Sequence, residues 1–298
     1  MNYYSWAFDT SLEEHDKRFH PGGFQDGDSC KFREQMKAES APDELIPNSG
    51  KVDDAAYLEA VKRGDMETCS RLIRNAVAKA MPDTKVIGED GLPKLVSHVS
   101  PSPIKVFDYK RIGTNGSLAG PGFYFMNGDI SKNGYLHRYG DFGTNAFINI
   151  TNPILIDEHG KTSRSITKEQ ISTLVRQFAL FGNDESKISD VVDAIHHGLN
   201  VTPNGDHVAT SSTIADDLGV INALFRSQQE RWGGEQNAVF ADMVRYITGF
   251  DGTMNVAGGP VAFINSQIKS ADPVTYDDNG QPIPLSKRFD FNNPDIRY

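Results

Sequence analysis

The run Gly-Pro-Gly-Phe-Tyr-Phe at positions 120–125 constrains the fold of this chain more than any other segment. Glycine and proline interrupt helices, whereas consecutive aromatic residues favour extended strands. Glycine within a strand also marks a place where another backbone or a ligand approaches closely. We therefore expect a turn that leads into a strand carrying Tyr124. A buried aromatic strand that contacts no ligand is the plainer alternative.

A second candidate strand lies upstream and carries a histidine. Residues 94–98 read Lys-Leu-Val-Ser-His, and the pair Phe107-Asp108 follows after a short segment that contains prolines. A histidine taken alone is more often structural than functional. Here it stands in a fixed order ahead of the aromatic run, so His98 is the second candidate site residue.

A third run closes the pattern near the end of the chain. The turn Gly-Phe-Asp-Gly at 249–252 precedes the apolar stretch 260–264, and Gln267 follows it. Upstream of this run, the segment 145–153 alternates apolar and polar residues and predicts a half-buried strand that stops at its Asn-Pro pair.

In order and spacing, the three runs resemble the nicotinamide-binding core of ADP-ribosyltransferases of the His-Tyr-Glu type, the branch of diphtheria toxin and the poly-ADP-ribose polymerases. The likeness is strongest to toxin-like domains of phage and mobile-element polyvalent proteins, in which the third residue can be Gln. It extends to the ending Asn-Pro-Asp-Ile-Arg-Tyr at 293–298. The implied fold is α+β: an ADP-ribosyltransferase-like split antiparallel β core with flanking helices and a helical insertion.

The resemblance implies NAD as the substrate and three catalytic residues. His98 would bond the nicotinamide-proximal ribose or the adenosine side of NAD, Tyr124 would stack on the nicotinamide, and Gln267 would bond the ribose 2′-hydroxyl. The bond between nicotinamide and ribose breaks through a transition state with oxocarbenium character. Gln267 can form hydrogen bonds but cannot ionise, so it supplies neither charge nor a general base.

Neighbouring positions are implied to contact NAD through the backbone. Val99 and Ser100 would meet the nicotinamide amide, although the family has Gly where Val99 stands. Gly122 would allow the chain to lie close to the dinucleotide. These three positions complete the first part of the expected binding site.

Two tyrosines are alternatives for a second stacking position. Tyr135 lies eleven positions (135 − 124) beyond Tyr124, which is the offset in the polymerase branch, and Asn133 would be the small polar residue before it. Phage-type relatives instead favour a Tyr-Gly pair, which here is Tyr139-Gly140. Both alternatives remain open from the sequence.

Composition and charge argue against several other classes. The 298 residues are 38% hydrophobic, enough for one sizeable core with appendages. A net charge of −10 argues against a broad nucleic-acid surface. No segment has the length of a membrane span, and the first residues lack a secretory signal. Cys30, Cys69 and the scattered histidines predict neither a disulfide framework nor a metal site.

We expect an N-terminal arm at 1–52, with a short helix at 29–39, and an ADP-ribosyltransferase-like domain at 53–298. Within that domain, two helices separated by Gly64-Asp65 are predicted before residue 81. The short polar run 276–280 predicts a hairpin turn close to the end of the chain.

A helical insertion is expected at about 158–247. Its predicted helical segments are 167–181, 186–197, part of 212–231, and 235–246. The predicted boundary residues are Thr167 and Ser186 as N-caps, Gly182 and Gly198 as stops, and His196-His197 as a helix end. This lobe is expected either to shape access to NAD and its acceptor or to be purely structural.

The resemblance implies a mono-ADP-ribosyltransferase of phage or toxin type that transfers ADP-ribose from NAD to a macromolecule, expected to be a protein, in the cytoplasm of a bacterial host. Polymer formation is not expected because the Glu of the elongating branch is absent. Asn265-Ser266 lacks the Gln or Glu associated with arginine modification. One alternative is a catalytically degenerate binding or virion-associated structural protein on the same scaffold. Another is an NAD glycohydrolase, in which water takes the ribosyl group.

Overall fold

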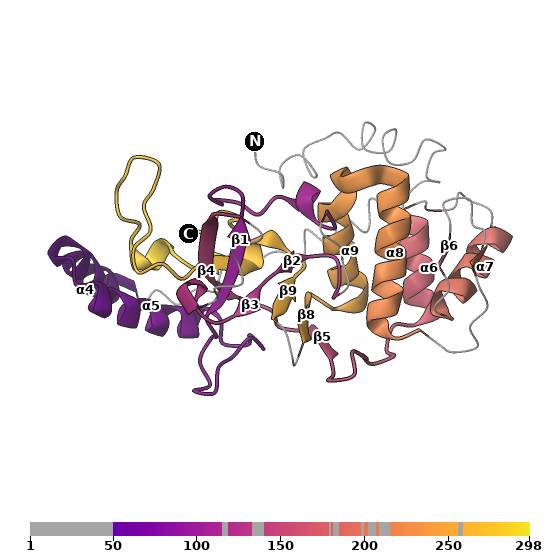
Figure 1. Ribbon diagram of the computed structural model, residues 1–298, viewed down its shortest axis with the longest axis horizontal. Coiled ribbons are helices and arrows are strands. Elements are labelled where there is room, and N and C mark those ends of the chain that lie inside the picture. Colours follow the sequence, from indigo (N-terminus) through magenta and orange to yellow (C-terminus); the bar gives the residue numbers. More distant parts are fainter. Residues whose placement is uncertain are drawn as a thin grey trace.

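The computed structural model describes residues 50–114, 119–132, 140–178, 180, 185–197, 200–201, 207–208, 215–255 and 259–298. Two four-stranded sheets, mostly antiparallel, occupy the middle of an elongated molecule. A pair of helices, α4 and α5, lies at one end and a group formed by α6, α7, α8 and α9 at the other (Figure 1). The predicted α+β class is confirmed, whereas the helix expected at 29–39 lies outside the described residues.

The first sheet has the strand order β10-β4-β1-β3, and all its neighbours are antiparallel. Its strands are β1 (Val96–Ser100), β3 (Met126–Asn127), β4 (Phe142–Ile148) and β10 (Ile268–Ser270). The register sets His98 opposite Thr144, so these two side chains lie on the same face of the sheet. The predicted strand at His98 is therefore confirmed, two residues later than expected.

The second sheet has the order β2-β9-β8-β5. Its strands are β2 (Phe123–Tyr124), β5 (Pro153–Ile156), β8 (Gly252–Asn255) and β9 (Pro260–Ala262), and only β5 and β8 are parallel. A single residue, Phe125, separates β2 from β3, and its N–H donates to Pro260 O at 3.0 Å. One extended segment, 123–127, thus belongs to both sheets and joins them.

The strand expected at 145–153 is divided in two. β4 ends at Ile148, and Pro153 begins β5 instead of ending a strand. The buried carboxylate of Asp251 causes the break, because it accepts hydrogen bonds from the backbone and hydroxyl of Thr151 and from the N–H of Asn152 at 2.8–2.9 Å. Proline is tolerated as a first strand residue since it has no N–H to donate.

The helical pair expected before residue 81 is confirmed as α4 (Gly50–Arg63) and α5 (Met66–Ala80). Gly64 turns the chain with a φ of 69°, and Asp65 caps α5 by accepting from Thr68 N at 3.0 Å. The pair is attached to the rest of the molecule by a separate apolar cluster. That cluster contains Tyr57, Ala60, Cys69, Ile73, Val77, Met81, Phe147, Leu285 and Phe289.

The helical lobe contains α6 (Lys168–Gln177), α7 (Glu185–His196), α8 (Asp217–Trp232) and α9 (Asn237–Thr248). Thr167 caps α6 in a capping box with Gln170, as predicted. The N-cap prediction for Ser186 is wrong, because α7 already begins at Glu185. The pair β6 (Asn200–Val201) and β7 (His207–Val208) was not expected, and Gly182 and Gly198 lie outside the described residues.

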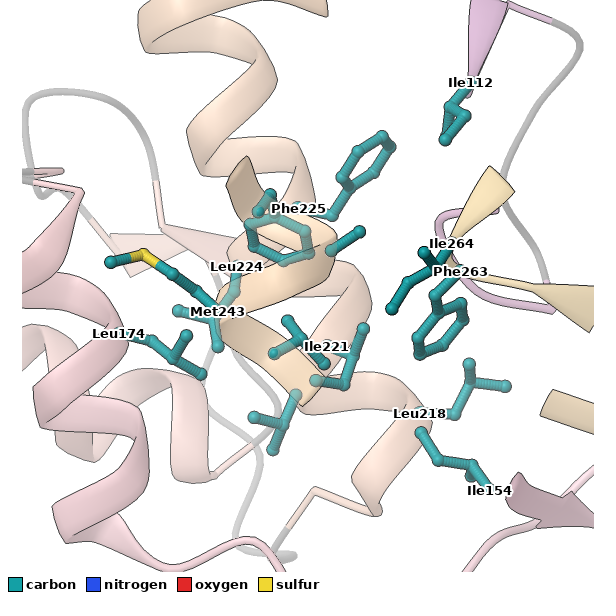
Figure 2. Close-up of a cluster of buried hydrophobic side chains, with 14 of the residues drawn as sticks. Ile112, Ile154, Leu174, Leu218, Ile221, Leu224, Phe225, Met243, Phe263 and Ile264 are labelled. Atoms are coloured by element: carbon teal, nitrogen blue, oxygen red, sulfur yellow. The ribbon is translucent and has the colours of Figure 1, made fainter. Parts of the chain in front are cut away.

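Helix α8 connects the lobe to the second sheet. Figure 2 shows Phe263 and Ile264, which follow β9, beside Ile221 and Phe225 of α8. The first residue of α8, Asp217, is buried and accepts hydrogen bonds from Ser163, Ser165 and Ile166. These bonds attach the segment before α6 to the start of α8. These bonds hold the pKa of the carboxyl below its ordinary value despite burial.

Candidate functional site

His98 is the central residue of β1, and its ring is held on several sides. Nδ1 lies 2.8 Å from Tyr124 O. Because a carbonyl oxygen only accepts, Nδ1 carries the proton and Nε2 is left as an acceptor. The ring meets Phe107 edge-on at 5.1 Å and Phe125 at 5.5 Å. Burial lowers the pKa of His98, so the imidazole is neutral at pH 7.

Tyr124 offers its ring but not its hydroxyl. The hydroxyl donates to Gly120 O at 2.7 Å and accepts from Ala119 N at 3.0 Å. Burial of the phenol raises its pKa to about 12, so it remains protonated in the neutral range. The side chain is nevertheless 36% exposed, unlike its neighbours Phe123 and Phe125, which are buried. The predicted strand carrying Tyr124 is confirmed.

The glycines around Tyr124 have a structural reason. A Cβ on Gly122 would lie 2.3 Å from Ala262 O, and a Cβ on Gly259 would lie 1.8 Å from Phe125 O. Both contacts are far inside van der Waals distance, so these residues must be glycine for β2 and β9 to pair. Gly122 was predicted to approach the dinucleotide. The structure instead shows that Gly122 is needed for the close approach of the neighbouring strand β9.

Val99 and Ser100 continue β1 beyond its pairing with β3, which ends at Ser97. Side chains alternate along a strand, so Val99 points away from the face that carries His98. Its branched side chain therefore does not obstruct that face. The Ser100 hydroxyl is already engaged, since it donates to Ser102 O at 2.6 Å. Only backbone groups of these two residues are suited to the predicted ligand contact.

Both polar atoms of the Gln267 side chain are already hydrogen-bonded to backbone groups. Its Oε1 accepts from Ile264 N at 3.0 Å and its Nε2 donates to Asn149 O at 3.0 Å. The residue ends the short 3-10 turn η5 (Asn265–Gln267), is 8% exposed and immediately precedes β10. The amide that was expected to bond ribose is used to fasten the turn to the end of β4.

The structure brings His98 and Tyr124 together and leaves Gln267 apart. Gln267 O accepts from Asn149 N, just after the end of β4. His98 instead pairs with Thr144, which precedes Asn149 by five positions (149 − 144). At about 3.3 Å per residue, this offset alone is about 17 Å. β4 also separates β10 from β1 in the sheet order. The three predicted catalytic residues therefore do not form one cluster.

The strand beside Tyr124 is β9, where Val261 is its direct partner. The sequence from 255 to 264 contains no Asp or Glu, so this strand supplies no carboxylate next to Tyr124. The sequence marked the apolar run 260–264 but not its pairing with β2, because such a run resembles any buried strand. The signal that identifies it is the Gly258-Gly259 pair directly before it, which indicates close backbone approach.

Thr144 and Phe142 were not predicted as site residues but share the face of His98. The Thr144 side chain is half-buried and makes no hydrogen bond within the described residues. Phe142 lies opposite Ser100 and is 43% exposed, which is unusual for a large apolar ring. The alternation of β4 between its two faces was a usable signal for these residues.

Asn133, Tyr135 and Tyr139 lie outside the described residues. The turn leading toward them, η2 (Ile130–Lys132), is fixed to β4, because Ile130 N donates to Asn145 Oδ1 at 2.9 Å. Asp129 completes the turn by accepting from Ser131 N at 2.8 Å.

Among the described residues, no group of three His, Cys, Asp or Glu side chains is arranged to hold a metal ion. None of the helices in the described ranges is long and apolar enough to cross a membrane. Comparisons of the chain with models of protein families, with curated proteins and with solved structures find no match. The functional argument therefore depends on the site geometry and on the sequence runs.

Proposed function

We propose that the chain is an NAD-dependent mono-ADP-ribosyltransferase of the phage or toxin type. The observation that carries the proposal is the pairing of His98 with Tyr124 at the junction of the two sheets. The fold supports it as well, since two mostly antiparallel sheets joined through the segment 123–127 agree with the split β core that the resemblance implies.

The protonation of His98 defines its role toward NAD. With the Nδ1 proton donated to Tyr124 O, Nε2 accepts a hydrogen bond from a ribose hydroxyl. Thr144, on the same face, can donate or accept a second bond to the sugar. The exposed ring of Tyr124 stacks on nicotinamide and holds it as it leaves.

In the proposed reaction, the bond between ribose C1′ and the nicotinamide nitrogen breaks, and its electron pair goes to nicotinamide. A nucleophile on the acceptor then bonds C1′ and loses its proton to solvent. Neither the amide of Gln267 nor any side chain of β9 offers negative charge to the ribosyl cation. Turnover is therefore expected to be slow relative to binding.

A second candidate is a binding or virion-associated structural protein that holds NAD without cleaving it. The observation that favours it is the engagement of both polar atoms of the Gln267 side chain by backbone groups. An NAD glycohydrolase is the third candidate, since water can replace the acceptor. We place the transferase reaction in the cytoplasm of a bacterial host and propose a protein as acceptor.

Calorimetric titration of the full chain with NAD, followed by incubation with labelled NAD and a bacterial lysate, separates these candidates. Labelled protein indicates transfer, free ADP-ribose alone indicates hydrolysis, and binding without turnover indicates the scaffold. The variant Tyr124→Ala should weaken NAD binding, whereas Tyr276→Ala, which removes another exposed tyrosine ring, should not. Equal NAD binding by wild type and Tyr124→Ala would refute the proposed site.

A further inference from the structure

Residues 293–297, which we call the C-terminal clasp, join two segments that lie far apart in the sequence. On one side, Ser270 N donates to Ile296 O at 2.8 Å, next to β10. On the other side, Ile296 N donates to Lys105 O at 2.9 Å, and Asp295 forms an antiparallel bridge with Val106. The clasp is therefore hydrogen-bonded through its backbone to β10 on one side and to the segment 104–107 on the other.

Side chains lock the clasp in the same place. Ile296 is buried in the main core. Asp278 accepts from Lys105 Nζ at 2.7 Å and from Arg297 Nη1 at 2.8 Å, so one carboxylate connects the clasp to the segment 104–107. The buried amine of Lys269, on β10, donates to Asn293 O at 2.5 Å. The contacts come from both neighbours of the clasp, which fixes its position.

The segment held by the clasp ends in Phe107, the residue against His98. Phe107 is 3% exposed, and its ring contacts the rings of His98, Phe123 and Phe125 at 5.1–5.5 Å. Its carbonyl is anchored separately by Asn265 Nδ2 at 3.2 Å. The orientation of the His98 ring is set by these aromatic contacts together with the hydrogen bond from Nδ1 to Tyr124 O.

We propose that the C-terminal clasp is a positioning element for His98, acting through the segment 104–107 and the ring of Phe107. A chain end that merely closes the core would stabilise the protein without influencing the imidazole. The clasp instead bonds the two residues directly before Phe107, so its loss frees that ring to move away from His98. The effect on the imidazole is independent of NAD, whereas any effect on NAD binding rests on the proposed function.

The test follows the pKa of His98 in the full chain by NMR titration of its ring proton, with His98→Gln identifying the signal among the eight histidines. In Ile296→Ala and in Phe107→Leu, water reaches the ring, and its pKa should rise toward that of an exposed histidine. NAD affinity should fall about two- to thirty-fold, the range for residues coupled through packing. Ile296→Val, which keeps most of the packing, should restore both readouts.

The matched control is Leu285→Ala, since Leu285 is equally buried but belongs to the apolar cluster of α4 and α5. It should lower the melting temperature and leave the pKa of His98 unchanged. A wild-type pKa in Ile296→Ala, or an equal rise in Leu285→Ala, would overturn the positioning role. If wild type does not bind NAD, the proposed function fails, while the pKa comparison still decides the role of the clasp.

Discussion

The strand with Tyr124 and the turn with Gln267 are two regions that the sequence marks equally well, but the fold uses them differently. The Tyr124 hydroxyl is hydrogen-bonded to the turn at 119–120, whereas the ring remains partly exposed. Gln267 is buried, and both the oxygen and the nitrogen of its amide are hydrogen-bonded to backbone groups. The comparison shows that a side chain can contact a ligand only through atoms that are not already engaged in contacts within the protein.

The physical cause of the difference is the geometry of each region. β2 is paired by β9 along its backbone, so the Tyr124 side chain is not needed to satisfy main-chain groups of the strand. The turn η5 leaves Ile264 N and Asn149 O without a regular partner, and a buried main-chain group without a partner is costly. Gln267 has one donor and one acceptor at the right reach and supplies both.

The largest effect is expected from Gln267→Glu. A carboxylate can accept from Ile264 N but cannot donate to Asn149 O, and it adds a buried negative charge. We expect a loss of about 3–4 kcal/mol in the free energy of unfolding at pH 8, and a smaller loss at pH 5, where the protonated acid donates again. Urea denaturation at both pH values measures it. A variant that is as stable as wild type and turns over NAD faster would restore Gln267 as a catalytic residue.

A smaller loss is expected from Gly122→Ala, which tests the Tyr124 side of the comparison. The new methyl group would collide with Ala262 O, so β2 must move away from β9. We expect about 2–3 kcal/mol lower stability together with loss of NAD binding. Gly160→Ala is the control: its φ is positive but its surroundings are open, and it should cost about 1 kcal/mol with NAD binding intact. Normal NAD binding by Gly122→Ala would show that the pairing of β2 with β9 is not needed for the proposed NAD site.

Tyr124→Phe separates the ring from the hydroxyl. The variant loses the two hydrogen bonds to the turn at 119–120, so its stability should fall by about 1 kcal/mol. NAD affinity should stay close to that of wild type because stacking needs only the ring. Thermal denaturation and calorimetric titration give the two numbers. Should Tyr124→Phe bind NAD as poorly as Tyr124→Ala, the hydroxyl or the turn it holds would be the contact.

The smallest expected effect is a pH dependence that originates from His98. Burial lowers its pKa in the folded state, so the unfolded chain binds more protons below the ordinary histidine value. Its contribution to stability is complete above about pH 6.5 and is lost as the pH falls through the folded pKa. We expect wild type to lose up to about 1 kcal/mol more than His98→Gln between pH 7.5 and pH 5. Identical losses in denaturant titrations would show that the ring is not buried in solution.

Much of the fold could be predicted because its signals are local. Gly64-Asp65 divides α4 from α5, Thr167 begins α6, and Gly280, with a φ of 74°, turns the chain near its end, all as the sequence indicated. A cap or a turn depends on residues only a few positions away, so its residues specify it directly. Ser186 failed as a cap because α7 already begins one residue earlier, at Glu185, and a sequence pattern places a helix end only to within a residue or two.

The sequence by itself determined the α+β class, the strands at His98 and Tyr124, and the residue types available for chemistry. Only the tertiary structure decided that β9 borders Tyr124, that Pro153 begins a strand, and that Gln267 fastens a turn. Each of these decisions involves partners far apart in the chain, such as Gln267 and Asn149, 118 positions from each other. Local propensity carries no information on such pairings, because they are set by which buried main-chain groups still need a partner once the sheets have formed.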